Sequence, residues 1–200
     1  VTNPPRLEAI VPGKILLSER ILQCKNGSII YAELRSHVLT NGSFQAIVRD
    51  ITERKRTEAS LRLSEELNSR IIEAMPAGIV NITMNGSIIK ANKTAQRILG
   101  LSFDELQKKY ISDFETVTFR EDGTICPVDE YPAARCLKEN KTQDSVVIGV
   151  QRPDGEISWS IFTAIPLNDV VTNEQTGAVV CFIDITNRKK TEELLLTREK

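Results

Sequence analysis

One segment of nine residues occurs twice in this chain of 200 residues. Residues 50–58 read DITERKRTE and residues 184–192 read DITNRKKTE, so seven of the nine positions are identical. An apolar, strand-like run precedes each copy, and a charged, helix-like stretch follows it. Internal repeats constrain the architecture of a chain more strongly than single motifs do. The repeat therefore predicts two modules, which end at about residues 52 and 186 and each pass the chain to a helix.

The repeat extends towards the N-terminal side of each copy. Residues 25–31 read KNGSIIY and align with residues 153–159, which read PDGEISW. Between its last two expected strands, the second copy has residues 168–177 where the first has the short turn 40–43. Loops absorb such insertions at little cost, so we expect the same sheet in both copies.

The overall composition argues against several classes of partner. A formal net charge of −1 gives no electrostatic reason to bind nucleic acid, and an aromatic content of 5% offers few residues for base stacking. No apolar run approaches the roughly 20 residues that cross a bilayer, and the N-terminus lacks the pattern of a secretory signal. We expect no nucleic-acid partner and no direct membrane contact in this segment. Because the chain starts with Val1, we expect a longer parent protein, which could be membrane-anchored elsewhere.

The four cysteines and the single histidine show no metal-site spacing. Cys24, Cys126, Cys136, Cys181 and His37 are scattered along the sequence and contain no Cys-x-x-Cys pair. Tetrahedral zinc sites need clustered ligands. We interpret the cysteines as small apolar side chains in a reducing compartment, which indicates a cytoplasmic location.

Residues 1–52 carry the pattern of three antiparallel strands. After an irregular start over residues 1–13, loosely alternating apolar residues predict strands at 14–24, 28–39 and 44–51. An Asn-Gly pair separates each strand from the next, and such pairs form hairpin turns because both residues tolerate positive φ. A three-stranded sheet needs other elements over its apolar face, so we expect this segment to be only part of a domain.

Residues 53–76 predict a helical linker, because the stretch contains no Gly and is rich in Glu, Arg, Leu and Ser. Thr52 is its expected N-cap. Leu67 and Ile71 lie on a narrow apolar seam of an otherwise charged rod, which favours a two-stranded coiled coil. We therefore expect a homodimer through the helical linkers, with residues 187–200 beginning the second such helix.

Residues 77–186 predict one complete module. The order of elements is two strands, several short helices and three further strands. This order fits an α+β fold, with a five-stranded antiparallel sheet and short helices on one face. Ser102 and Glu105 form a capping-box pattern for one short helix. Asp129 is the expected cap of the last helix, over residues 131–139.

The second module resembles a PAS sensor domain. The resemblance rests on the order of its elements and on the phrases Ala77-Gly78-Ile79-Val80, Asn85-Gly86, Ala91-Asn92, Asp154-Gly155 and Asp184-Ile185-Thr186. The stretch DGTICPVDEYPAAR at 122–135 is similar to a subgroup in multidomain bacterial and archaeal sensors. Residues 1–52 resemble only the last three strands of a second PAS domain, so the chain resembles a tandem with its first member incomplete.

The resemblance implies a sensory, signal-transmitting and dimerisation module of a larger signalling protein. In such a domain, events in a small cavity shift the last strand and the helix attached to it. We therefore expect Asp50, Thr52, Asp184 and Thr186 to be the signal-transmission joints. The alternative is that these four residues are only good helix caps.

No cofactor is expected from the residues. Haem-binding members of the family use a histidine on the helix before the third strand, and residues 129–139 contain none. Light-sensing members carry a flavin-reactive cysteine in an Asn-Cys-Arg-Phe-Leu-Gln phrase, which is missing here, and Cys136 lies on a different helix. Tyr31 and Trp159 occupy equivalent positions in the repeat and are interpreted as sheet packing. An unidentified small ligand stays open, because apolar cavities leave little trace in a sequence.

The segment shows no catalytic constellation. With His37 as its single histidine, it offers no Ser-His-Asp or Cys-His arrangement, and it has no Gly-x-x-x-x-Gly-Lys phosphate loop. Three hypotheses stand for the parent. It is a two-component sensor histidine kinase, or a diguanylate cyclase or phosphodiesterase, or a scaffold that binds proteins without sensing a ligand. In the first two cases the partner of this segment is the output domain downstream.

Overall fold

The computed structural model of the chain describes residues 15–39 and 41–198. The chain divides into two units, Val1–Asn68 and Ser69–Lys200, and each is described by itself. The irregular start predicted over residues 1–13 and the last two residues of the predicted output helix lie outside the described residues. Within the described part, no helix combines the length and the apolar character needed to cross a bilayer.

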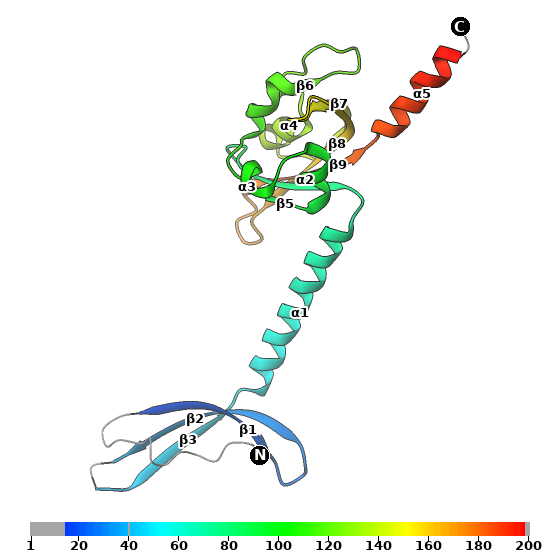
Figure 1. The fold of residues 1–200 in the computed structure, drawn as a ribbon. Coiled ribbons are helices and arrows are strands. Elements are labelled where there is room, and N and C mark those ends of the chain that lie inside the picture. The colour runs from blue at the N-terminus through cyan, green and yellow to red at the C-terminus, as the bar shows by residue number, and fades with distance from the viewer. Residues whose placement is uncertain (1–14, 40, 199–200) are drawn as a thin grey trace. The chain divides into compact units, whose positions relative to one another are not determined.

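The first unit contains a three-stranded antiparallel sheet, coloured blue to cyan in Figure 1. Its strands, in spatial order, are β1 (Leu16–Gln23), β2 (Ile29–Val38) and β3 (Phe44–Asp50). The Asn-Gly turn forms between β1 and β2: Gly27 has a φ of 84°, and the Asn26 side chain accepts the amide of Ser28 at 3.0 Å. Glycine adopts this conformation without steric cost, which is why the turn forms at this dipeptide.

Helix α1 (Thr52–Ala74) follows β3, and the boundary between the two units falls inside it. None of its residues is buried. The apolar side chains of Leu61, Leu67 and Ile71 are 60%, 56% and 46% exposed. Most helices in globular proteins are stabilised by burying an apolar face, and α1 does not bury one within the described residues.

The second unit contains a six-stranded antiparallel sheet in the order β5-β4-β9-β8-β7-β6. Its strands are β4 (Gly78–Thr83), β5 (Ile88–Ala91), β6 (Thr118–Phe119), β7 (Gln143–Gln151), β8 (Ile157–Asn168) and β9 (Gln175–Asp184). The prediction of five strands was therefore wrong by one. The additional strand, β6, has two residues and exists through its pairing with Val150 and Gly149 of β7. A two-residue strand has no periodicity of its own that a sequence could reveal.

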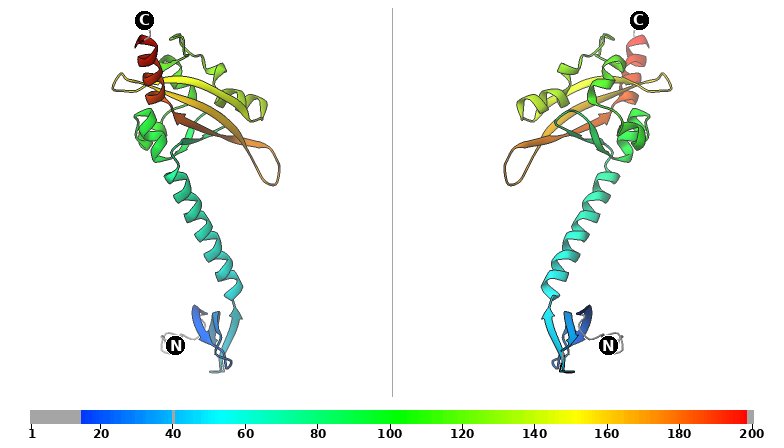
Figure 2. Two further views of the ribbon diagram at one scale, coloured as in Figure 1. Left: turned by 90° about the vertical axis from the view of Figure 1, so that its right-hand side faces the viewer. Right: turned by 90° about the vertical axis from the view of Figure 1, so that its left-hand side faces the viewer.

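Short helices lie on one face of this sheet, which curls around them (Figure 2). They are α2 (Lys93–Leu99), α3 (Phe103–Leu106) and α4 (Pro132–Glu139), with the 3-10 helices η2 (Ile111–Val117) and η3 (Val128–Glu130) between them. The hydrophobic core of the unit fills the space between these helices and the sheet. The second unit is therefore an α+β domain, as predicted for residues 77–186.

The cap of one short helix agrees with the prediction from the sequence, and the cap of another differs from it. Ser102 and Glu105 form the predicted capping box at the start of α3. The cap predicted for α4 was wrong, because Tyr131 is its N-cap and Asp129 lies in η3, whereas the helix itself, Pro132–Glu139, agrees with the predicted range to within one residue. Proline is favoured at the first helical position, since its missing N–H group needs no partner there.

Two stacked aromatic rings connect neighbouring strands of this sheet. Phe162 on β8 and Phe182 on β9 lie opposite each other, with ring centroids 4.8 Å apart. Gly78 on β4 makes room for Phe182, since a Cβ atom at Gly78 would lie 2.3 Å from the ring. Helix α5 (Thr186–Arg198) follows β9 directly.

Candidate functional site

An apolar cavity of about 80 Å³ lies between the sheet of the second unit and its short helices. Ile148, Val150, Phe162 and Phe182 line it from the sheet, and Ala133 lines it from α4. Sites for drug-sized ligands have roughly 300–1,000 Å³. The cavity therefore suits a molecule of only a few heavy atoms.

Two hydroxyl groups reach the cavity, those of Thr118 and Tyr131, and they are hydrogen-bonded to each other. The Thr118 hydroxyl donates in turn to the carbonyl of Cys126 at 3.1 Å. Burial raises the pKa of Tyr131 to about 12, so its phenol is neutral at pH 7. Because these hydroxyls already satisfy each other, the cavity presents no charged group to an occupant.

Two further hydroxyls, those of Ser158 and Ser160 on β8, are buried without a hydrogen-bond partner among the described residues. In the register of the sheet, Ser158 lies opposite Val150 and Ser160 lies opposite Ile148. Directly opposed residues present their side chains on one face, so these hydroxyls lie on the cavity side of the sheet. Buried hydroxyls without a partner are uncommon. These two hydroxyls are therefore unsatisfied polar groups of the sheet, and neither residue lines the cavity itself.

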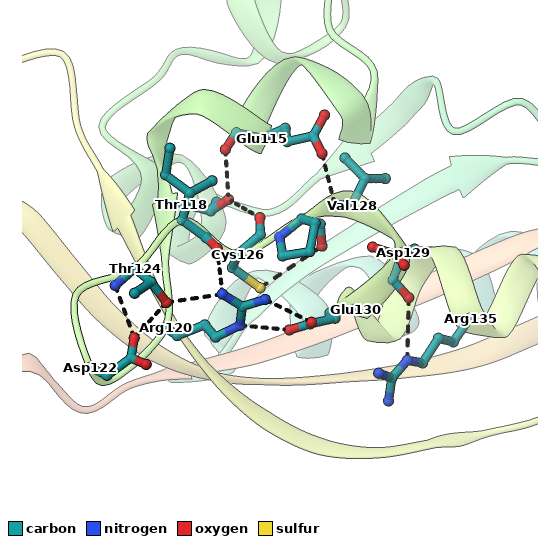
Figure 3. Close-up of polar contacts among 12 residues, drawn as sticks. Glu115, Thr118, Arg120, Asp122, Thr124, Cys126, Val128, Asp129, Glu130 and Arg135 are labelled. Carbon is teal, nitrogen blue, oxygen red and sulfur yellow. Dashed lines mark hydrogen bonds and ion pairs between the residues drawn. The ribbon is translucent and has the colours of Figure 1, made fainter.

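Residues 118–131, which we call the strap, contribute Thr118 and Tyr131 to the cavity. Polar contacts hold the two ends of the strap together (Figure 3). The guanidinium group of Arg120 donates to the carboxylate of Glu130 at 2.8 and 2.9 Å. The hydrogen bond from Arg120 lowers the pKa of Glu130. The strap is therefore a loop whose ends are joined by an ion pair and whose first and last residues line the cavity.

The carboxylate of Asp122, in the strap, is engaged in a local contact. Asp122 accepts both the amide and the hydroxyl of Thr124, at 2.9 and 2.6 Å (Figure 3). Across the described residues, no three side chains of His, Cys, Asp or Glu come together in a way that could hold a metal ion. The chemistry of the strap is therefore that of turns and ion pairs.

The junction between β9 and α5 brings together the predicted joint residues Asp184 and Thr186. The amide of Thr186 donates to the Asp184 carboxylate at 2.9 Å, and the Thr186 hydroxyl accepts the amide of Trp159 at 3.0 Å. The amide of Ile185 donates to the carbonyl of Trp159 at 2.8 Å. Trp159 lies on β8, next to β9 in the sheet. The start of α5 is therefore attached to the neighbouring strand through both backbone groups of one residue.

The junction between β3 and α1 has the same geometry. The amide of Thr52 donates to the Asp50 carboxylate at 2.8 Å, and the Thr52 hydroxyl accepts the amide of Tyr31 at 2.9 Å. The amide of Ile51 donates to the carbonyl of Tyr31 at 2.8 Å. Hydrogen bonds from Thr52 lower the pKa of Asp50. The sequence repeat is therefore also a repeat of hydrogen-bond geometry.

The structure changes the interpretation of two kinds of residue at these junctions. Thr52 was expected to cap its own helix, but its hydroxyl accepts an amide from the neighbouring strand, and the carboxylate of Asp50 accepts the amide of Thr52 instead. Tyr31 and Trp159 were interpreted only as sheet packing. In the structure their backbone amides donate to the hydroxyls of Thr52 and Thr186, respectively. Their equivalent positions in the repeat were the signal that could have identified them.

Comparisons with known proteins agree with this architecture. A family model described as PAS domain matches residues 76–187. Sporulation kinase E of Bacillus subtilis (strain 168) is 36% identical over 76 residues, which cover 38% of this chain, so the chain spans only 10% of that protein.

Solved structures of similar fold include two PAS domains. The PAS domain of an HTR-like protein from Haloarcula marismortui is 18% identical, with a TM-score of 0.49, and the match covers 66% of this chain and 99% of that one. A PAS domain from Colwellia psychrerythraea is 17% identical, with a TM-score of 0.48, and the match covers 61% of this chain and 97% of that one. Because the family model matches more than half of its residues, the chain belongs to the PAS domain family.

Proposed function

We propose that this chain is the sensory and signal-transmitting part of a multidomain signalling protein, in which the second unit detects a small molecule and passes the signal to α5. The observation that carries the proposal is the course of β9. Val180 and Phe182 line the cavity, and Asp184 receives the first amide of α5 only two residues later. Alternate residues of a strand share one face, so a displacement of Phe182 is transmitted along a stiff backbone to the joint.

The occupant that fits the cavity is small and mostly apolar. The lining carries no charge, and the hydroxyls of Thr118 and Tyr131 are paired with each other. Haem and flavin are much larger than about 80 Å³, so we propose no cofactor of either kind.

We propose a two-component sensor histidine kinase in the cytoplasm as the parent protein, with its kinase part as the output domain. The similarity to Sporulation kinase E supports this proposal, because the name of that protein describes a kinase. The reaction that the full-length parent protein catalyses distinguishes these alternatives. A histidine kinase phosphorylates itself, a diguanylate cyclase makes and a phosphodiesterase hydrolyses a cyclic dinucleotide, and a passive scaffold does none of these.

We propose that the first unit is the C-terminal part of another PAS domain and that two copies of the chain pair through α1. The sheet β1-β2-β3 ends in the same Asp-Ile-Thr joint as the complete domain, which supports the first part. The exposed apolar residues along α1, among them Leu67 and Ile71, support the second part. The oligomeric state of the chain tests the pairing: Leu67→Lys lowers the dimer fraction in light scattering, whereas Arg62→Lys, on the same helix, leaves it unchanged.

The role of the joint is tested in the parent protein with two matched alanine variants. The carboxylate of Asp184 accepts the amide of Thr186 at 2.9 Å, and the carboxylate of Asp154 accepts the amide of Glu156 at 3.0 Å in a hairpin turn. Both substitutions remove a carboxylate that accepts local hydrogen bonds, two at Asp184 and one at Asp154, but only Asp184 lies at the joint. We expect Asp184→Ala to change kinase output and Asp154→Ala to leave it unchanged. Equal output from both variants, with equally lowered stability, would make Asp184 only a helix cap.

The ligand is tested by denaturing the purified chain and identifying the released molecules by mass spectrometry. We expect a small apolar compound at a stoichiometric amount, and a protein without visible absorption. A chain with the cavity filled by Ala133→Leu is the control, because it should release none of the compound. Equal release from both chains would place the compound outside this cavity.

A further inference from the structure

A lysine in the first turn of α5 contacts two parts of the domain that are distant in the sequence. The ammonium group of Lys189 forms an ion pair with the carboxylate of Glu121, in the strap. The same ammonium lies over the ring of Trp159, 5.4 Å from the ring centroid. The Lys189 side chain is only 24% exposed, which is low for a lysine on the first turn of a surface helix. These contacts attach α5 to the strap in addition to its attachment to β8.

The first unit shows the corresponding contact with a different partner. Lys55 occupies the position equivalent to Lys189 in the repeat, and its ammonium contacts the carboxylate of Glu19 at 2.6 Å. Glu19 lies on β1, so this ion pair stays within the three-stranded sheet and its helix. Glu121 lies outside the equivalent strands β7, β8 and β9. In the second unit, the equivalent lysine therefore contacts the strap, which contributes two residues to the cavity lining.

Within the strap, Glu121 is linked to the cavity residues by its sequence neighbours and by two side-chain contacts. Glu121 follows Arg120, whose guanidinium holds Glu130 at the other end of the strap. Glu130 is followed directly by Tyr131, whose hydroxyl group binds Thr118 at the cavity. An occupant that displaces Tyr131 or Thr118 therefore moves the loop on which Glu121 lies.

We propose that the Glu121–Lys189 ion pair is a regulatory clasp between the strap and α5, which transmits a change in the cavity to the helix along a route separate from the Asp184–Thr186 joint. The proposal deepens the proposed function and rests on it, because it assigns a second path between the same cavity and the same helix. The clasp is closed in the structure described here. Filling the cavity shifts the strap, opens the clasp and loosens the first turn of α5.

The first experiment asks whether the clasp exists in solution. The amide of Lys189 donates to the carbonyl of Ile185 at 2.9 Å, so its hydrogen exchange, measured by NMR in the full chain, reports on the first turn of α5. We expect Glu121→Gln and Lys189→Gln each to accelerate this exchange about two- to five-fold, the range of a partly exposed ion pair. The double variant should exchange no faster than Lys189→Gln alone, which removes both the ion pair and the contact with Trp159. Strictly multiplicative effects would show that the two residues act independently and would overturn the proposal.

The second experiment asks whether the clasp carries a signal from the cavity. Ala133→Leu fills the cavity from α4, and exchange of the Lys189 amide is compared in the presence and absence of Glu121→Gln. We expect Ala133→Leu to accelerate exchange in the chain with an intact clasp and to add nothing when Glu121 is already substituted. If Ala133→Leu prevents folding, xenon under pressure fills the same apolar space in the chains with and without Glu121→Gln.

Each outcome of the second experiment has one meaning. An equal acceleration with and without Glu121 assigns transmission to the Asp184–Thr186 joint, so the clasp fails while the proposed function stands. No acceleration in either chain means that the cavity does not influence α5, so both fail. Glu19→Gln is the matched control, because it breaks the equivalent ion pair of Lys55 in the first unit and should leave exchange of the Lys189 amide unchanged.

Discussion

The hydroxyl oxygen of Thr186 lies 3.0 Å from the backbone nitrogen of Trp159, and this hydrogen bond joins the first residue of a helix to the middle of a sheet. The same hydroxyl contacts the Asp184 carboxylate at 2.5 Å. Thr186 is thus a bridge between the end of β9 and its neighbour β8. A helix attached in this way changes its direction only by breaking the bridge or by moving the strand.

We expect Thr186→Val to lower the free energy of unfolding of the second unit by about 1–3 kcal/mol, the cost of leaving a partly buried donor without a partner. Valine has the shape of threonine but cannot accept the amide of Trp159. Urea unfolding followed by the fluorescence of Trp159, the single tryptophan, measures this loss. Thr191→Val is the control, because its hydroxyl bonds only within the exposed helix. Equal stability of the two variants would show that the bridge contributes nothing.

Tyr131→Phe tests the polar pair at the cavity. The substitution removes the phenol that binds Thr118, while the Thr118 hydroxyl retains the carbonyl of Cys126. We expect a loss of about 0.5–1.5 kcal/mol in the free energy of unfolding, as for one neutral hydrogen bond. Tyr110→Phe should cost almost nothing, because Tyr110 is 44% exposed. A loss of the same size at both positions would contradict the structural role of the pair.

Gly177→Ala tests the close approach of β4 and β9. A Cβ atom at Gly177 would lie 2.1 Å from the carbonyl oxygen of Ile82, which belongs to the backbone and cannot rotate away. The two strands must separate locally, and we expect destabilisation of about 1–3 kcal/mol or more. Thr176→Ala at the neighbouring exposed position should cost less than about 1 kcal/mol. Thermal unfolding followed by circular dichroism compares the two variants. A Gly177→Ala chain as stable as the unsubstituted chain would contradict the close approach of β4 and β9.

The ion pair of Arg120 and Glu130 predicts a pH dependence of the strap. The Arg120 hydrogen bond lowers the pKa of Glu130 from 4.5, so this carboxylate stabilises the folded strap above pH 4.5, and the contribution is lost as the pH falls through the lowered value. Asp122, whose pKa is lowered from 3.8 by its bonds to Thr124, acts in the same direction at lower pH. Following the chemical shift of the Arg120 side-chain N–H group during acid titration measures the opening.

Glu130→Gln is the control for that titration. The amide cannot titrate, so the Arg120 signal should lose the transition that belongs to Glu130 and keep the part due to Asp122. An unchanged transition in this variant would assign the pH response to another carboxylate.

The sequence repeat predicted the positions of both junctions, because the Asp-Ile-Thr segment is local and each copy carries all of its side chains. Asp50 with Thr52, and Asp184 with Thr186, lie within hydrogen-bond distance in the structure. The partners of the threonine hydroxyls lie 21 and 27 residues away, on neighbouring strands. Local cap rules cannot identify such partners, since they depend on strand register.

The cavity could not be predicted from the sequence. Its lining comes from strands and helices throughout the second unit, and each lining residue looks like an ordinary core residue by itself. The Glu121–Lys189 pair could not be predicted either, because 68 residues separate its members in the sequence. The cap of α4 was predicted wrongly because Asp129 matches the preference for acidic N-cap residues, whereas Pro132 occupies the first helical position and leaves Tyr131 at the N-cap.

The identical bonding at the two strand–helix junctions has a consequence for how such proteins diversify. Every bond described at either junction joins main-chain atoms or the Asp and Thr side chains that both copies possess. A gene cut and religated at the threonine codon would keep that bonding whichever downstream coding region it acquired. New combinations of detector and effector can therefore arise by recombination at one codon, without the hydrogen bonds of the Asp–Thr joint having to evolve anew.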